Sequence, residues 1–164
     1  MNKDLLLELL THMEWADRKV LAAAAATGDA PPDEYLLKTL LHIHFTQFAF
    51  LGAWRGDTID WKSLKAIKTF EALAAWSSSN YGPIRDTLES RPDLSAPMVL
   101  TWANHFAKKV LDQPEAGVTS IGETFYQVVA HSNYHRAQAN RRIRELDVEP
   151  PGVDYIIWVW AGRP

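Results

Sequence analysis

The chain has 164 residues, of which 47% are hydrophobic and 23% charged, a composition typical of one soluble globular domain. Seventeen basic against 20 acidic residues give a net charge of −3, which argues against a nucleic-acid-binding surface, and no apolar run is long enough to cross a membrane. Cysteine is absent, so disulfides, thiolate metal sites and cysteine nucleophiles are excluded. Any metal must therefore be held by histidines and carboxylates. We expect one domain over residues 1–164.

The first half of the chain predicts two long helices. Apolar residues recur at three- and four-residue steps over 3–26, and we expect a helix there rather than a signal peptide. Gly28 and the following proline pair end it. Asp33 is a suitable N-cap for a second helix that runs to about Arg55, where Gly56 ends it.

The middle of the chain is less regular. We expect residues 57–67 to form a loop carrying Trp61, and Thr69 to cap a third helix. Gly82-Pro83 interrupts that helix and predicts a kink or an early stop. Residues 96–107 are short, apolar and flanked by turns, which favours either a strand and hairpin or a connecting segment.

The last long helix has the clearest start. Ser120 and Glu123 have the spacing of a capping box, and the helix then runs to about Leu146. The apolar tail, residues 154–160, is expected to pack back on the domain. Trp158 and Trp160 are expected to be core or interface anchors, and they would line the pocket if the tail folds over it. Four long helices in a small domain predict an all-α four-helix bundle with a less regular segment between helices 3 and 4.

Two of the six histidines stand four residues apart in the last helix. The rings of His131 and His135 lie about 40° apart around the helix, one turn above the other, which suits two ligands of one metal ion. Both share a side with apolar residues and point toward the bundle interior. The intervening Ser132, Asn133 and Tyr134 do not form an HExxH motif, so no glutamate base can be assigned.

A third ligand must come from another helix, and the second helix offers two histidines. His42 and His44 differ by about 200° in direction, so at most one of them can join the pair. This helix is apolar almost all round, and its periodicity slightly favours His44 as the more interior residue. An all-round apolar helix also suggests that one face is covered by something else, such as a second subunit.

Several motifs resemble the DinB-like family. They are Met13-Glu-Trp-Ala-Asp-Arg18 in the first helix, the segment 41–56, and His131-x-x-x-His135-Arg136-x-Gln138 followed by Pro-Pro and Asp154-Tyr-Ile. The resemblance covers residues ~5–56 and ~120–158, whereas 57–118 carries no matching motif. Ala137 replaces a frequent glycine, at a position that need not face the site.

The resemblance implies an up-down-down-up bundle whose three histidines hold a divalent metal, commonly nickel or zinc. By motif position the ligands are His42, His131 and His135, with His44 as the alternative to His42. Relatives include S-transferases and isomerases that use a low-molecular-weight thiol. Three imidazoles with open positions suit catalysis, because a bound ion lowers the pKa of coordinated water or thiol.

The leading hypothesis is therefore a cytoplasmic, homodimeric metal-dependent enzyme of transferase or hydrolase type that acts on a small molecule. The alternatives are a helical module that binds a metal or small ligand without turnover, and a bundle whose histidines hold no metal.

Gln138 is expected either to orient a ligand or to be a surface amide, and Arg136 to pair with a carboxylate on the surface or on the first helix. His12 and His105 are not expected to be ligands. Four arginines cluster near the end of the last helix and are interpreted as a solvated helix terminus, the alternative being a local basic patch: Arg136, Arg141, Arg142 and Arg144.

Overall fold

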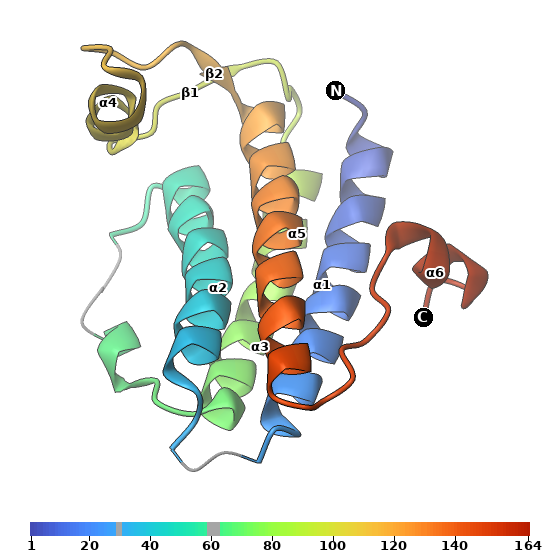
Figure 1. Ribbon diagram of the computed structural model, residues 1–164. Helices are drawn as coiled ribbons and strands as arrows, with labels where there is room; N and C mark the ends of the chain where they lie inside the picture. Colours follow the sequence, from blue (N-terminus) through green and yellow to red (C-terminus); the bar gives the residue numbers. More distant parts are fainter. Residues whose placement is uncertain (29–30, 59–62) are drawn as a thin grey trace.

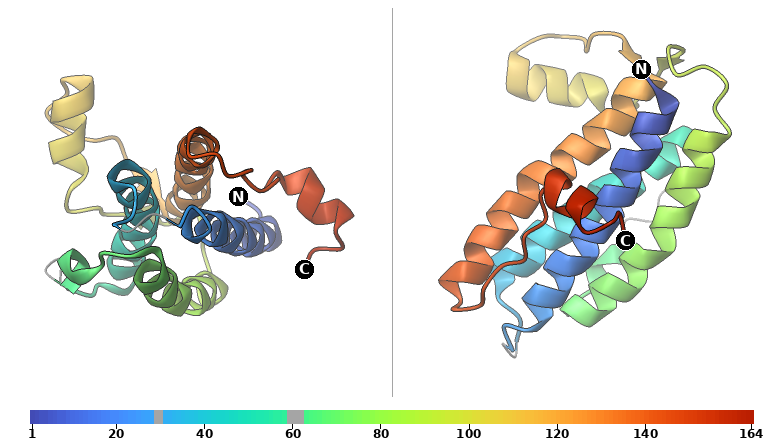
Figure 2. Two further views of the ribbon diagram at one scale, coloured as in Figure 1. Left: turned by 60° about the horizontal axis from the view of Figure 1, so that its bottom comes forward. Right: turned by 90° about the vertical axis from the view of Figure 1, so that its right-hand side faces the viewer.

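Four long helices dominate the computed structural model, which describes residues 1–28, 31–58 and 63–164. They are α1 (Lys3–Ala25), α2 (Glu34–Arg55), α3 (Phe70–Glu89) and α5 (Ile121–Glu145). The helices pack side by side, and α1 and α2 each contact both α3 and α5 (Figure 2). In Figure 1, α1 and α5 run from top to bottom, whereas α2 and α3 run from bottom to top. The predicted all-α class is confirmed.

Local capping chemistry sets the helix ends where the sequence predicts them. The side chain of Asp33 accepts a hydrogen bond from the first turn of α2, and that of Thr69 does the same for α3. Ser120 and Glu123 form the complete capping box of α5. Gly56 ends α2 with a φ of 73°, a left-handed conformation that costs glycine little. These boundaries therefore follow from residues close in sequence.

The early stop expected at Gly82-Pro83 is wrong, because α3 continues through Pro83 to Glu89. Proline has no N–H to donate to the carbonyl four residues earlier, that of Ser79. Ser79 is exposed, so water can satisfy this carbonyl. On the opposite side, Tyr81 and Ile84 are buried in the core. Tertiary packing thus holds the helix together across the proline.

An arm of short elements separates α3 from α5. Strand β1 (Pro97–Met98) pairs antiparallel with β2 (Thr119–Ser120), and between them lie α4 (Ala103–Phe106) and one π-helical turn, η2 (Ala107–Leu111). Residues 96–107 thus combine a short strand with a helix that the turn-flanked pattern did not predict. Within the expected loop 57–67 a 3₁₀ turn, η1 (Ser63–Ala66), is present, and Trp61 lies outside the described residues.

Buried polar residues form a layer between two apolar clusters of the core. One cluster is built around Met13, Phe50 and Phe125, and the other around Val20 and Ile143. On α1, α2 and α5, five of the buried polar residues fall between the positions that feed the two clusters. This polar layer comprises Asp17, His44, Gln47, Ser132 and Arg136, each no more than 2% exposed.

The C-terminal segment returns to α1 as a short helix, α6 (Tyr155–Trp160), seen beside α1 in Figures 1 and 2. Trp158 is buried there, so the predicted return of the tail is confirmed. The expectation for Trp160 as a core anchor is wrong, since its side chain is 77% exposed.

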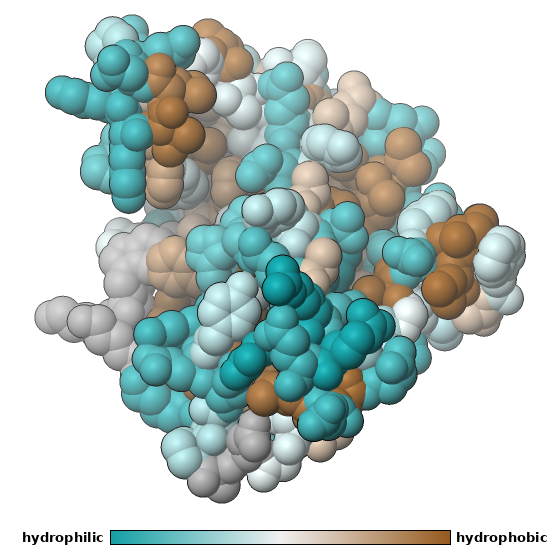
Figure 3. All heavy atoms as spheres, viewed as in Figure 1, coloured by the Kyte–Doolittle hydropathy of each residue, from teal (hydrophilic) through white to brown (hydrophobic). Residues whose placement is uncertain are grey.

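Figure 3 shows hydrophobic surface on α6 and on the arm. No helix in the described ranges is long and apolar enough to span a membrane.

Candidate metal centre

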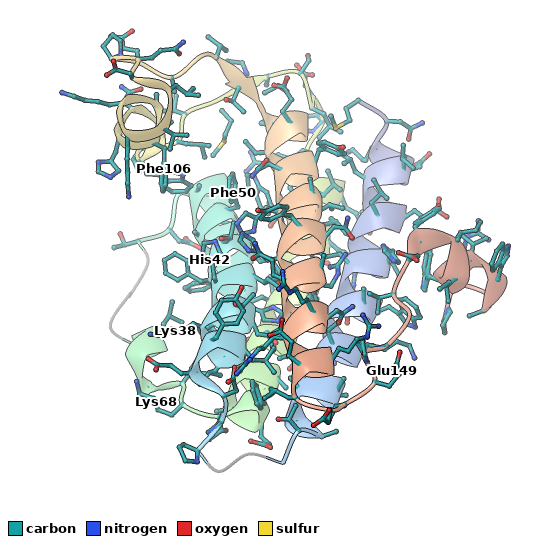
Figure 4. All side chains as sticks on the ribbon, in the orientation of Figure 1. Lys38, His42, Phe50, Lys68, Phe106 and Glu149 are labelled. Atoms are coloured by element: carbon teal, nitrogen blue, oxygen red, sulfur yellow. The ribbon has the colours of Figure 1, made fainter. Side chains whose placement is uncertain are left out.

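Three histidines from two antiparallel helices converge on one point. His131 and His135 lie one turn apart on α5, and a ring nitrogen of His42 on α2 lies close to theirs. Figure 4 labels His42 on α2. One ring nitrogen from each histidine lies within 4.8 Å of the others, and the Nε2 atoms of His42 and His131 are 3.1 Å apart. Two nitrogens bound to one ion at about 2.0–2.1 Å would be separated by about 3.0–3.4 Å. The spacing of His42 and His131 fits a shared ion.

The surroundings of His131 and His42 favour the neutral imidazole, the form that binds metals. Burial lowers the pKa of His131 to about 4, with added repulsion from the rings of His135 and His42. Burial and the neighbouring His135 also lower the pKa of His42. Protons therefore compete weakly for these nitrogens near neutral pH. His42 is exposed and the other two rings are half-buried, so the centre is open to solvent.

Gln138 fixes the ring of His135. Its Oε1 lies 2.7 Å from His135 Nδ1, and because an amide oxygen can only accept, the imidazole carries its proton on Nδ1. The Nε2 atom of His135 is then free to bind a metal, as is common for histidine ligands held by an outer partner. His131 differs, since its Nδ1 is buried without a hydrogen-bond partner in the described part of the chain.

His44, the alternative to His42, belongs to the core instead of the cluster. Its side chain is fully buried, and its Nδ1 lies 3.1 Å from Oε1 of Gln47. Burial lowers the pKa of His44, so the ring is neutral. His42 and His44 face different sides of α2, as their spacing predicts, and the structure brings only His42 to the pair on α5.

The other histidines, Trp158 and the arginines named in the sequence analysis lie away from this centre. His12 is buried and its Nε2 donates to the carbonyl of Val153, while its ring packs against Trp158. Trp158 therefore anchors the tail to α1 and does not wall the histidine cluster. His105 is exposed on the arm. The arginines near the end of α5 pair with acidic residues: Arg141 with Glu145, Arg142 with Asp33 and Glu145, and Arg144 with Glu149.

Arg136 departs from the solvated helix end, because it is buried and forms an ion pair with Asp17 of α1 at 2.6 Å. This is the pairing with helix 1 that was one of its two expected roles. Sequence reasoning did not assign a role to Asp17, Gln47 or Ser132, which complete the buried network. Gln47 was nevertheless visible as a polar residue in an otherwise apolar helix, and such residues are rarely buried without a partner.

An all-α fold with three convergent histidines defines a class of helical protein with a candidate metal centre. A search against known protein families matches residues 1–162 to the DinB family. The chain belongs to the DinB family. No curated protein and no solved structure is similar enough to the chain to count as a match.

Proposed function

We propose that His42, His131 and His135 bind a divalent metal ion, nickel or zinc, and that the chain is a metal-dependent enzyme. The observation that carries this proposal is the convergence of three imidazole nitrogens within 4.8 Å at a solvent-accessible face. Imidazole ligands suit both ions, and a three-ligand site leaves coordination positions for water or substrate. Membership of the DinB family supports the same assignment.

When bound, such an ion supplies Lewis acidity and lowers the pKa of a coordinated water or thiol. The chain's own residues hold it. His135 is oriented by Gln138, and His42 closes the cluster from α2. The chain has no cysteine, so sulfur chemistry here requires a low-molecular-weight thiol from solution. We therefore propose thiol-dependent S-transfer or isomerisation, or hydrolysis, of a small-molecule substrate.

Metal analysis of protein purified without a histidine tag tests the metal centre. We expect about one nickel or zinc ion per chain, and loss of the ion in His131→Ala. The matched control is His105→Gln, which alters an exposed histidine on the arm, outside the cluster. Metal content that is low in the unaltered protein, or equal in His131→Ala, would refute the proposal.

Turnover separates an enzyme from a module that only binds a metal or ligand. The metal-loaded protein is assayed with a panel of cofactor thiols and electrophilic substrates, and His42→Ala serves as the inactive control. Thiols that change neither the absorption spectrum of the bound metal nor the heat of mixing would exclude the S-transfer reaction.

We also propose that the protein is a cytoplasmic homodimer. The arm between α3 and α5 exposes apolar side chains that often mark protein contacts: Val99, Phe106, Val110 and Leu111. Figure 3 shows this hydrophobic surface on the arm. Sedimentation of the protein, compared with Val110→Asp, measures the oligomeric state. A monomer at high concentration would contradict the dimer.

A further inference from the structure

We propose that the polar layer positions the metal ligands, by fixing how α2 and α5 are rotated and shifted against each other. This inference rests on the proposed metal centre and assigns positioning roles to Gln47 and Ser132. Neither residue belongs to the histidine cluster. The argument starts from the bonds that the polar layer makes between helices.

Gln47 joins three helices through one amide. Its Nε2 donates to Oδ2 of Asp17 on α1 at 2.7 Å and to Oγ of Ser132 on α5 at 3.0 Å. Its Oε1 accepts a hydrogen bond from Nδ1 of His44 on the same helix. The orientation of the amide is therefore determined, since its nitrogen faces two acceptors and its oxygen faces a ring N–H. Arg136 closes the network by donating to Oδ1 of Asp17 at 2.6 Å.

The same helices carry the network and the ligands at short range. Ser132 directly follows His131, and Arg136 directly follows His135. Gln47 lies five residues beyond His42, about 7.5 Å along α2. In a rigid helix, neighbouring side chains move together. The rotation of α5 about its axis that allows Ser132 and Arg136 to form their hydrogen bonds therefore also sets the directions of the neighbouring ligands.

Small errors in helix placement would be costly for a metal site. A ring nitrogen about 7 Å from the helix axis moves by about 2 Å when the helix turns by about 20°. Metal–ligand distances tolerate only about 0.2 Å. The direction of the His131 ring depends on helix placement, since its buried Nδ1 has no hydrogen-bond partner among the described residues to orient it. Buried polar bonds give directional contacts that apolar packing lacks, and they can fix the register of packed helices.

Ser132→Ala tests the proposal, with Thr124→Val as its matched control. Thr124 is also buried on α5 and also bonds α2, accepting from Nε1 of Trp54 at 2.8 Å. It lies seven residues from His131, about 10 Å along the helix. Both substitutions remove one buried hydroxyl that bridges α2 and α5. We expect the two substitutions to lower the free energy of unfolding by similar amounts. Only Ser132→Ala changes a residue next to a metal ligand, His131.

Nickel and zinc affinities are measured by calorimetry at a temperature where far-ultraviolet circular dichroism shows both variants fully helical. We expect Ser132→Ala to lose about tenfold in affinity or more, and Thr124→Val to change by less than about threefold. The absorption spectrum of bound cobalt(II) should change in Ser132→Ala only. Gln47→Met, which removes both bonds to neighbouring helices, provides a second variant and should weaken binding at least as much.

Equal affinities in Ser132→Ala, Gln47→Met and Thr124→Val would overturn the positioning role while leaving the metal centre intact. Absence of binding by the unaltered protein is a different result. It would overturn the proposed function, and this inference with it.

Discussion

The buried ion pair between Asp17 and Arg136 makes the sharpest stability prediction. Both side chains are no more than 2% exposed, and the pair is separated by 2.6 Å. Arg136→Met removes the cation and leaves the carboxylate of Asp17 buried, with the amide of Gln47 as its one remaining side-chain partner among the described residues. Removing one member of such a pair costs about 3–5 kcal/mol, a large part of the about 5–15 kcal/mol that stabilises a typical domain.

The melting temperature translates this cost into a measurable shift. For a chain of this size, 1 kcal/mol changes the melting temperature by about 2–4 °C, so Arg136→Met should lower it by about 6–20 °C. The double variant Asp17→Leu/Arg136→Met removes both charges and should recover most of the loss, because well-packed apolar side chains replace such pairs at little cost.

Urea and thermal unfolding of the two single variants and the double variant give the coupling free energy between the two positions. The reasoning predicts that the double variant is more stable than either single variant. It would be refuted if Arg136→Met cost less than about 1 kcal/mol, or if the effects of the two single changes simply added in the double variant.

Three other outcomes are expected. Gln138→Leu removes the partner of the His135 ring and should weaken metal affinity by about tenfold in a calorimetric titration; unchanged affinity would contradict that role. In the metal-free protein the pKa of His131 is about 4 when folded, against about 6.5 when unfolded, so the unfolded state binds more protons between these values. Urea unfolding should therefore show stability falling as pH drops from about 6.5 to 4, and less so in His131→Gln; an equal fall would exclude this cause. Trp158→Ala should release the tail from His12, accelerating proteolysis there with metal affinity unchanged; slow cleavage would argue against the anchor.

Features that depend on neighbours in sequence were predictable. The caps at Asp33, Thr69 and Ser120 each satisfy a backbone group three residues away, so the bounds of the helices follow from local chemistry. The pair of histidines on α5 follows from helical geometry in the same way. Pro83 shows the limit, because packing of α3 against its neighbours outweighs a local breaker signal.

The third ligand could not be chosen from periodicity. His42 and His44 both lie on a helix that is apolar almost all round, and periodicity favoured His44 because it is the more interior residue. That observation is correct, since His44 is fully buried, but a buried ring bonded to Gln47 is not part of the open cluster. The bonds that hold Gln47 reach Asp17 and Ser132, which are 30 and 85 residues away. Only the family resemblance pointed to His42.

The most direct test of the metal centre is a crystal structure of the protein grown with nickel or zinc, with anomalous scattering recorded at the absorption edge of the metal. The account predicts one anomalous peak bound by ring nitrogens of His42, His131 and His135 at about 2.0–2.2 Å, with His44 still bonded to Gln47 in the core. A structure at saturating metal with no peak between α2 and α5, or with a peak held by other residues, would contradict it.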